Sequence, residues 1–257
     1  PFFKMHPDWR GVKAERSDRY ALCTSNPDVL EKLSKGVETL FRKVPELGGL
    51  FCITMSENLT NCFSKGCSDP AQFCPRCAKR TAPEVIVEVL EAVERGAHRA
   101  KADAEVIAWS WAWSPDWDED VIARLPSGVK LMMVSESHLE TDCCGGIKGK
   151  VIDYSISKPG PGPTFARLAN KARKAKIPII AKVQLNNTWE NSAVPYIPVP
   201  GLVQEHLDNL RALGVKDFMV SWTLGGYPGG NIPLLDKSKE ELAKERFGSA
   251  ASKILKA

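Results

Sequence analysis

The chain has 257 residues, 43% of them hydrophobic, which is enough apolar material to bury one large core or two small ones. Its 35 basic and 31 acidic residues give a net charge of only +4 and are spread along the chain, so neither nucleic acid nor a membrane surface is predicted as a partner. The longest apolar runs are also too short to span a bilayer. Because the chain opens on Pro1 instead of Met, we expect that its natural amino terminus is missing, and its compartment stays open.

The first half of the chain alternates predicted helices and strands. Asn26 before Pro27 predicts a helix start, with an N-cap followed by proline in the first turn, and apolar residues at helical spacing extend it to Val44. The elements expected next are a strand at 50–56, a helix from about Pro83, a strand at 105–111, a short acidic helix from Asp116 and a strand at 129–135.

The pattern loosens beyond these elements. A Gly/Cys loop at 142–149 and an extended segment at 151–157 precede a rigid Pro/Gly turn at 159–163, after which Thr164 is expected to cap a basic helix. The remaining predictions are a strand at 179–185, a helix at 202–213, a strand at 217–222 and a last amphipathic helix at 236–256.

Strands that alternate with helices predict an α/β fold with a parallel sheet. The five strands fit either an open sheet or an incomplete (β/α)8 TIM barrel that retains about five carboxyl-terminal β/α units. No Gly-rich phosphate loop follows any strand, which favours the barrel with its amino-terminal strands missing. The predicted domains are a barrel portion over 1–235, with a Cys-rich loop at 58–82, and a helix after the barrel at 236–257.

Polar and aromatic side chains follow the predicted strands where each strand ends. Glu57 directly follows the strand at 50–56, Glu136 directly follows 129–135, and Glu190 lies beyond the strand at 179–185. Barrel enzymes keep their catalytic residues at the carboxyl ends of strands, although a single such Glu is more often a helix cap or a loop residue. Indole faces stack on sugar rings, with core packing as the alternative. The residues expected to bind a sugar are Asn58, Trp111, His138, Asn186, Asn187, Trp189, Trp222, Tyr227 and His6.

Four cysteines crowd the loop after the first strand: Cys62, Cys67, Cys74 and Cys77. Four thiolates at this spacing, ending in a C-x2-C pair, predict a structural zinc site with no open coordination position. Two disulfides in an exported protein are the main alternative, and a redox motif is a third. Cys23 is expected to be an ordinary buried thiol.

Several motifs together resemble a known group of enzymes. They are His6-Pro7-Asp8-Trp9, Cys23-Thr24-Ser25-Asn26-Pro27, Thr54-Met55-Ser56-Glu57-Asn58, Pro195-Tyr196-Ile197-Pro198-Val199-Pro200 and Ser221-Trp222-Thr223-Leu224-Gly225-Gly226-Tyr227-Pro228. The chain is similar in these to a bacterial group of (β/α)8-barrel glycoside hydrolases related to family-20 hexosaminidases and family-67 α-glucuronidases. The resemblance implies that 50–56 is the fourth barrel strand and that Glu57 is the general acid/base. Ser56 stands where family-20 enzymes have an Asp, so the sugar stays open.

The sequence thus predicts a glycosidase that acts on an oligo- or polysaccharide through two carboxyl groups. Glu57 is one of them and either Glu190 or Glu136 is the other, and their separation would set retention or inversion. The alternative is a non-catalytic glycan-binding barrel with a zinc-stabilised loop. No organic cofactor, nucleic acid partner or membrane span is expected.

Overall fold

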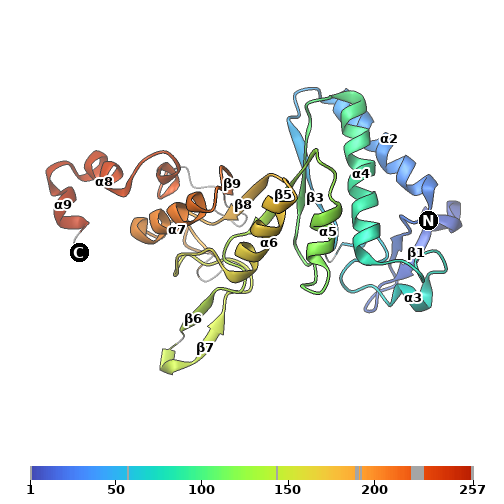
Figure 1. The fold of residues 1–257 in the computed structure, drawn as a ribbon, viewed down its shortest axis with the longest axis horizontal. Helices are drawn as coiled ribbons and strands as arrows, with labels where there is room; N and C mark the ends of the chain where they lie inside the picture. Colours follow the sequence, from blue (N-terminus) through green and yellow to red (C-terminus); the bar gives the residue numbers. More distant parts are fainter. Residues whose placement is uncertain are drawn as a thin grey trace. The chain divides into compact units, whose positions relative to one another are not determined.

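A computed structural model describes residues 2–56, 58–142, 144–188, 191, 193–220 and 229–255 (Figure 1). The chain divides into two compact units. Unit 1 consists of Pro1–Met132 and Asn170–Pro178, and unit 2 consists of Met133–Ala169 and Ile179–Ala257. Among the described residues, the largest sheet has five strands in the order β3-β4-β5-β8-β9, and the strand pairs described below are parallel. The predicted α/β class and parallel sheet are confirmed, whereas membership in an eight-stranded barrel stays a prediction.

Three parallel strands begin in unit 1: β3 (Gly49–Ile53), β4 (Glu105–Trp109) and β5 (Val129–Val134). Gly49 lies opposite Glu105, and Val106 lies opposite Val129. Each strand is shorter than predicted at its carboxyl end. β4 ends before Ala112, whose φ of 61° turns the backbone out of the extended conformation. Trp111, which was expected on this strand, therefore lies in the turn after β4 together with Trp113.

Two long helices of unit 1, α2 (Pro27–Lys43) and α4 (Ala82–Ala100), lie side by side (Figure 1). The predicted N-cap of α2 is confirmed, because the Asn26 side chain accepts a hydrogen bond from the Asp28 backbone N–H. Helix α4 begins with a capping box and buries one apolar face, formed by residues such as Ile86, Leu90 and Val93.

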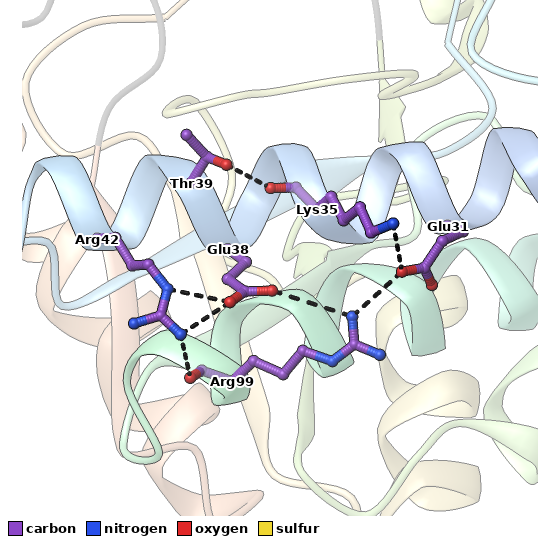
Figure 2. Close-up of polar contacts among 6 residues, drawn as sticks. All are labelled: Glu31, Lys35, Glu38, Thr39, Arg42 and Arg99. Carbon is purple, nitrogen blue, oxygen red and sulfur yellow. Dashed lines mark hydrogen bonds and ion pairs between the residues drawn. The ribbon is translucent and has the colours of Figure 1, made fainter.

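Charged side chains connect the exposed surfaces of α2 and α4 (Figure 2). The guanidinium of Arg99 on α4 lies 3.5 Å from Glu31 and 4.0 Å from Glu38, both on α2. Arg42 donates to Glu38 at 2.8 Å and to the Arg99 carbonyl at 3.4 Å. Lys35 adds a 3.5 Å contact with Glu31. These pairs are solvent-exposed, so the apolar face of α4 stabilises the packing of the helices more than they do.

The amino-terminal part of unit 1 forms an antiparallel pair that the sequence did not predict, β1 (Arg10–Lys13) with β2 (Tyr20–Leu22). This pair is a separate two-stranded sheet, so residues 1–25 add no strand to the parallel sheet. The short elements of unit 1 are α1 (Phe2–Met5), the 3-10 helix η1 (Pro7–Trp9), α3 (Pro70–Phe73) and α5 (Asp118–Arg124).

In unit 2, β8 (Ile179–Val183) pairs in parallel with β9 (Asp217–Val220), and Ile180 lies opposite Asp217. The Ser135 backbone N–H donates to the Lys182 carbonyl at 3.1 Å, which brings the residues after β5 alongside β8. The main helices are α6 (Pro163–Lys174), which begins in this unit, and α7 (Pro200–Ala212). Both agree with the predicted helices to within two residues at their starts.

Three predictions for unit 2 differ from the structure. The expected loop at 142–149 carries a hairpin of β6 (Glu140–Asp142) and β7 (Lys148–Lys150), with the 3-10 helix η2 (Cys144–Gly146) between them (Figure 1). The segment 151–157 consists of bends, with no strand. The single helix expected at 236–256 is divided into α8 (Lys239–Phe247), η5 (Gly248–Ala250) and α9 (Ala251–Ile254), after the 3-10 helix η4 (Ile232–Leu235), because Gly248 has a φ of 52°.

Over the ranges given above, no helix has both the length and the apolar composition that a membrane crossing requires.

Candidate functional site

The most unusual feature of unit 2 is a group of polar side chains around the ends of β5 and β8, all of them buried except the half-buried Asp153. We call it the Glu136 cluster, and its members are Glu136, Asp153, Tyr154, Lys182, Gln184 and His206. Glu136 is the second residue after β5, and Lys182 lies within β8; both are completely buried. The strands thus position these two side chains, and the surrounding apolar core excludes water from them.

Burial controls the protonation of Glu136. It raises the pKa of the Glu136 carboxyl to about 8, and the neighbouring charge of Asp153 adds to the rise. The nearby Ser135 hydroxyl and the backbone of Glu136 and Gln184 lower the pKa and so oppose this rise. Their effect is small beside that of burial, because neither carboxylate oxygen has a well-formed hydrogen bond within the described part of the chain. Glu136 is therefore a neutral, proton-carrying carboxyl at neutral pH.

Burial has the opposite effect on the basic members of the cluster and lowers their pKa values. Burial lowers the pKa of Lys182 to about 8, against the charges of Asp153 and Glu136, which favour the ammonium. Burial also lowers the pKa of His206, on α7, to about 4, so its imidazole is neutral. The His206 Nδ1 lies 3.8 Å from a carboxylate oxygen of Glu136, and the Lys182 Nζ lies 5.4 Å from the centre of the Tyr154 ring.

The rigid turn at 159–163 packs directly against the strand end that carries Glu136. The Gly162 backbone N–H donates to the Ser135 carbonyl at 2.7 Å. A Cβ added at Gly162 would lie 2.2 Å from the Ser137 carbonyl oxygen, and one added at Gly160 would lie 2.8 Å from the His206 Nε2. The two glycines of this turn thus allow its backbone to approach the cluster more closely than any side chain would permit.

The two asparagines after β8 have different surroundings. Asn186 belongs to a structural network, in which its Oδ1 accepts from the Asn231 backbone N–H at 2.8 Å and its Nδ2 donates to the Gly229 carbonyl at 3.4 Å. Asn187 is completely buried, and neither atom of its amide has a hydrogen-bond partner among the described residues. The Asn186 amide therefore connects backbone segments, whereas a sugar contact for Asn187 stays a prediction.

His138, another predicted sugar-binding residue of unit 2, lies on the surface. It has a φ of 62°, and its Nδ1 is 2.7 Å from the Thr164 hydroxyl at the start of α6. This contact explains its place in a tight turn without any ligand.

The predicted sugar-binding residues of unit 1 do not form one group. His6 stacks on Trp9 with ring centres 4.4 Å apart, and Asn58 is exposed with its backbone N–H bonded to Ser56. Trp111 stacks on Trp109 at 5.4 Å. Trp111 also lines an open groove of 720 Å³ whose charged residues are Glu15, Arg16, Arg19 and Lys65.

Trp113 packs in the core and does not form a sugar-binding surface. Its side chain is buried, and its Nε1 donates to the Thr54 hydroxyl at 3.0 Å. Glu57, Glu190, Trp189, Trp222 and Tyr227 lie outside the described residues, so their roles stay predictions.

Unit 1 contains a second candidate site, made of sulfur atoms. We call it the thiol cluster, and it consists of Cys23, Cys62, Cys74 and Cys77, whose Sγ atoms all lie within 4.8 Å of one another. The Cys23 sulfur is 3.6 Å from that of Cys74 and 3.8 Å from that of Cys77, and all four residues are buried. This is a set of four thiols that could hold a metal ion.

The structure corrects one member of the cysteine set predicted from the sequence. Cys67 was expected as a ligand and Cys23 as an ordinary thiol, but Cys23 belongs to the thiol cluster and Cys67 packs beside it. The Cys67 sulfur contacts the Asn61 carbonyl at 3.8 Å. The physical reason is that Cys23 directly follows β2, and the unpredicted β1–β2 pair brings this residue, distant in sequence, to Cys74 and Cys77. Cys52 stays apart, and burial raises its pKa to about 12.

Sequence reasoning also missed Lys182, Gln184 and His206 as members of the Glu136 cluster. A signal for two of them exists, since Lys182 and Gln184 alternate with apolar residues along the β8 segment and therefore face one side of the sheet. His206 lies on the amphipathic α7 helix, where nothing in the sequence distinguishes it from a structural histidine.

No protein-family model matches the sequence, and no curated protein matches it significantly. Solved structures that match the chain include a GH5-4 broad specificity endoglucanase from an uncultured bacterium, at 12% identity and a TM-score of 0.39. Another is a psychrophilic glycoside hydrolase family 10 endo-beta-1,4-xylanase, at 10% identity and a TM-score of 0.41. Each alignment covers 82% of this chain and 61% of the other, so the chain spans about three-fifths of their length.

Proposed function

We propose that the chain is part of a glycoside hydrolase and that Glu136 is one of its functional carboxyl groups. The observation that carries the proposal is a buried carboxyl that keeps its proton at neutral pH, at the carboxyl end of a parallel strand. Cleavage of a glycosidic bond needs one carboxyl that is protonated, to donate to the leaving oxygen, and a second that is ionised. The raised pKa of Glu136 supports the first of these roles.

The other carboxyl groups of the proposal come from the resemblance and from the sequence pattern. A nucleophile or base must be ionised, so the raised pKa of Glu136 favours Glu190 over Glu136 for that task. Glu57 remains the general acid/base that the resemblance implies, and Glu136 would then bind a sugar hydroxyl as a hydrogen-bond donor. If Glu57 has no such role, Glu136 is the proton donor itself. The Asn187 amide would supply a further sugar contact.

A panel of nitrophenyl glycosides and natural oligosaccharides tests the proposal, with the parent chain and the Glu136→Gln variant. General acid help is worth about 10²–10⁴-fold. We expect Glu136→Gln to lose turnover by about that factor on a substrate with a poor leaving group if Glu136 is the donor, and much less on an activated aryl glycoside.

Parallel Glu57→Gln and Glu140→Gln variants complete the design. Glu57→Gln shows which residue is the donor, since only the donor's variant distinguishes the two kinds of substrate. Glu140 is exposed and serves as the matched control. Hydrolysis at the parent rate by both Glu136→Gln and Glu57→Gln would contradict the proposal.

A non-catalytic glycan-binding protein is the second candidate, and the groove beside Trp111 favours it, because a stacked indole and basic side chains line an open surface. This function predicts saturable binding of oligosaccharides that Trp111→Ala abolishes, with no hydrolysis of any substrate in the panel. Calorimetric titration and product analysis by chromatography distinguish the two candidates.

A further inference from the structure

The thiol cluster occupies the place of a hydrophobic core in the amino-terminal part of unit 1. Its four cysteines pack with Val12 of β1, and with Phe63 and Cys67 at the edge, into a small separate core. The residues come from three segments: the end of β2, the loop after β3, and the turn around α3. Small cores of this kind usually need a metal ion or covalent links in addition to apolar contacts.

The spacing of the sulfur atoms distinguishes a metal site from disulfides. A tetrahedral zinc site with Zn–S bonds of about 2.3 Å requires sulfurs about 3.8 Å apart. The Cys23 sulfur lies 3.6 Å and 3.8 Å from two members of the cluster, which matches two edges of such a tetrahedron. A disulfide would bring one pair to about 2.05 Å. Four sulfurs within 4.8 Å of one another are also too close to surround an iron–sulfur cluster, which places its iron atoms between them.

Polar groups around the cluster suit thiolates that carry negative charge. The Arg76 Nε donates to the Cys23 sulfur at 3.2 Å, and the same guanidinium reaches the Asp8 carbonyl at 2.6 Å. The Ser25 hydroxyl lies 3.2 Å from the Cys77 sulfur and accepts from Arg80 at 3.0 Å. Hydrogen bonds of this kind orient metal ligands, and the Arg76 guanidinium partly balances the charge of four thiolates around a divalent ion. Arg80 also pairs with Glu88, so it acts here mainly by orienting the Ser25 hydroxyl.

We propose that Cys23, Cys62, Cys74 and Cys77 bind one zinc ion in a closed, structural site that fixes the β1–β2 pair to the loop after β3. With four protein ligands, the site leaves no position for a substrate, so the ion stabilises structure and takes no part in bond cleavage. The close fit of β1 supports this assembly, because a Cβ added at Gly11 would lie 2.5 Å from the Cys62 sulfur.

The loop that the proposed zinc site anchors is the one that follows β3. Next to Cys62, the Asn61 side chain donates to the Thr54 carbonyl at 2.6 Å, and the Thr60 hydroxyl donates to the same oxygen at 3.1 Å. Thr54 directly follows β3, so hydrogen bonds link the end of this strand to the first cysteine of the loop. Loss of the metal should therefore loosen both the β1–β2 pair and this loop.

Metal analysis by mass spectrometry of the full chain tests the proposal, with Cys23→Ser and Cys67→Ser as a matched pair. Cys23 belongs to the thiol cluster and Cys67 packs beside it, so the two substitutions have equal chemistry and different expected results. We expect one zinc per chain in the parent and in Cys67→Ser, and loss of most of the zinc from Cys23→Ser. Zinc retained by Cys23→Ser and lost from Cys67→Ser would overturn the assignment.

A second measurement keeps the proposal testable if Cys23→Ser does not fold. The parent is alkylated in denaturant without a reducing agent and then digested. We expect alkylation of all four cluster cysteines, with faster cleavage by trypsin in 10–25 and 58–82 after treatment with a zinc chelator. Disulfides among these four cysteines, iron in place of zinc, or a parent free of metal after purification without chelators would each refute the zinc site. These results do not depend on hydrolase activity, so failure of the glycosidase proposal leaves them intact.

Discussion

Replacement of Glu136 by glutamine should remove a large pH dependence of stability. The folded pKa of Glu136 is about 8, against an ordinary value of 4.5. Between these values the unfolded chain ionises at this residue while the folded chain keeps the proton, so the folded state binds more protons and the free energy of unfolding falls as pH rises. The contribution of Glu136 is fully present below about pH 4.5 and lost by about pH 8, and a rise of this size is worth on the order of 5 kcal/mol.

Urea denaturation of the parent and of Glu136→Gln, repeated at several pH values in this range, measures the effect. The difference in unfolding free energy between the two proteins reports Glu136 together with the groups whose pKa values depend on its charge, chiefly Lys182; titrating groups remote from Glu136 are present in both proteins and cancel. His206 loses its contribution as pH falls from 6.5 to about 4 in either protein. Glu140→Gln, at an exposed position, should follow the parent. A difference between parent and Glu136→Gln that stays constant from pH 5 to pH 8, within about 0.5 kcal/mol, would refute the argument that burial keeps this carboxyl protonated.

Two further predictions concern the packing of α2 against α4. A Cβ added at Gly96 would lie 2.2 Å from the Ser34 carbonyl oxygen, so Gly96→Ala should lower the unfolding free energy by about 1–3 kcal/mol in urea denaturation. Gly36→Ala has open space and should raise it by up to about 1 kcal/mol, and equal effects at the two sites would contradict the close approach. Arg99→Ala should cost less than about 1 kcal/mol, because the Arg99 side chain is 41% exposed. That cost should shrink further in high salt, and a larger, salt-independent loss would show that Arg99 matters through packing instead.

The sequence by itself determined the local elements wherever hydrophobic periodicity and capping chemistry agree. The start of α2 at Asn26 and Pro27 was readable because an N-cap and a first-turn proline depend on neighbouring residues alone. The strands β3, β4, β5, β8 and β9 were readable because buried parallel strands are short apolar runs between helices. Their carboxyl ends were less predictable, since a backbone turn such as that at Ala112 depends on what packs around it.

Only the tertiary structure decided which side chains meet. From the sequence we predicted a set of four cysteines that lie close together along the chain. In the structure, the β1–β2 pair brings Cys23 into this set, and Cys67 lies outside it. Glu136 was a candidate from its place after a strand, yet its protonation depends on Asp153 and on the water-free core around it, which no local pattern encodes. His206 reaches Glu136 through the packing of α7. Periodicity and capping depend on residues close in sequence, whereas metal ligands and pKa values depend on distances and burial that form only when remote segments pack together.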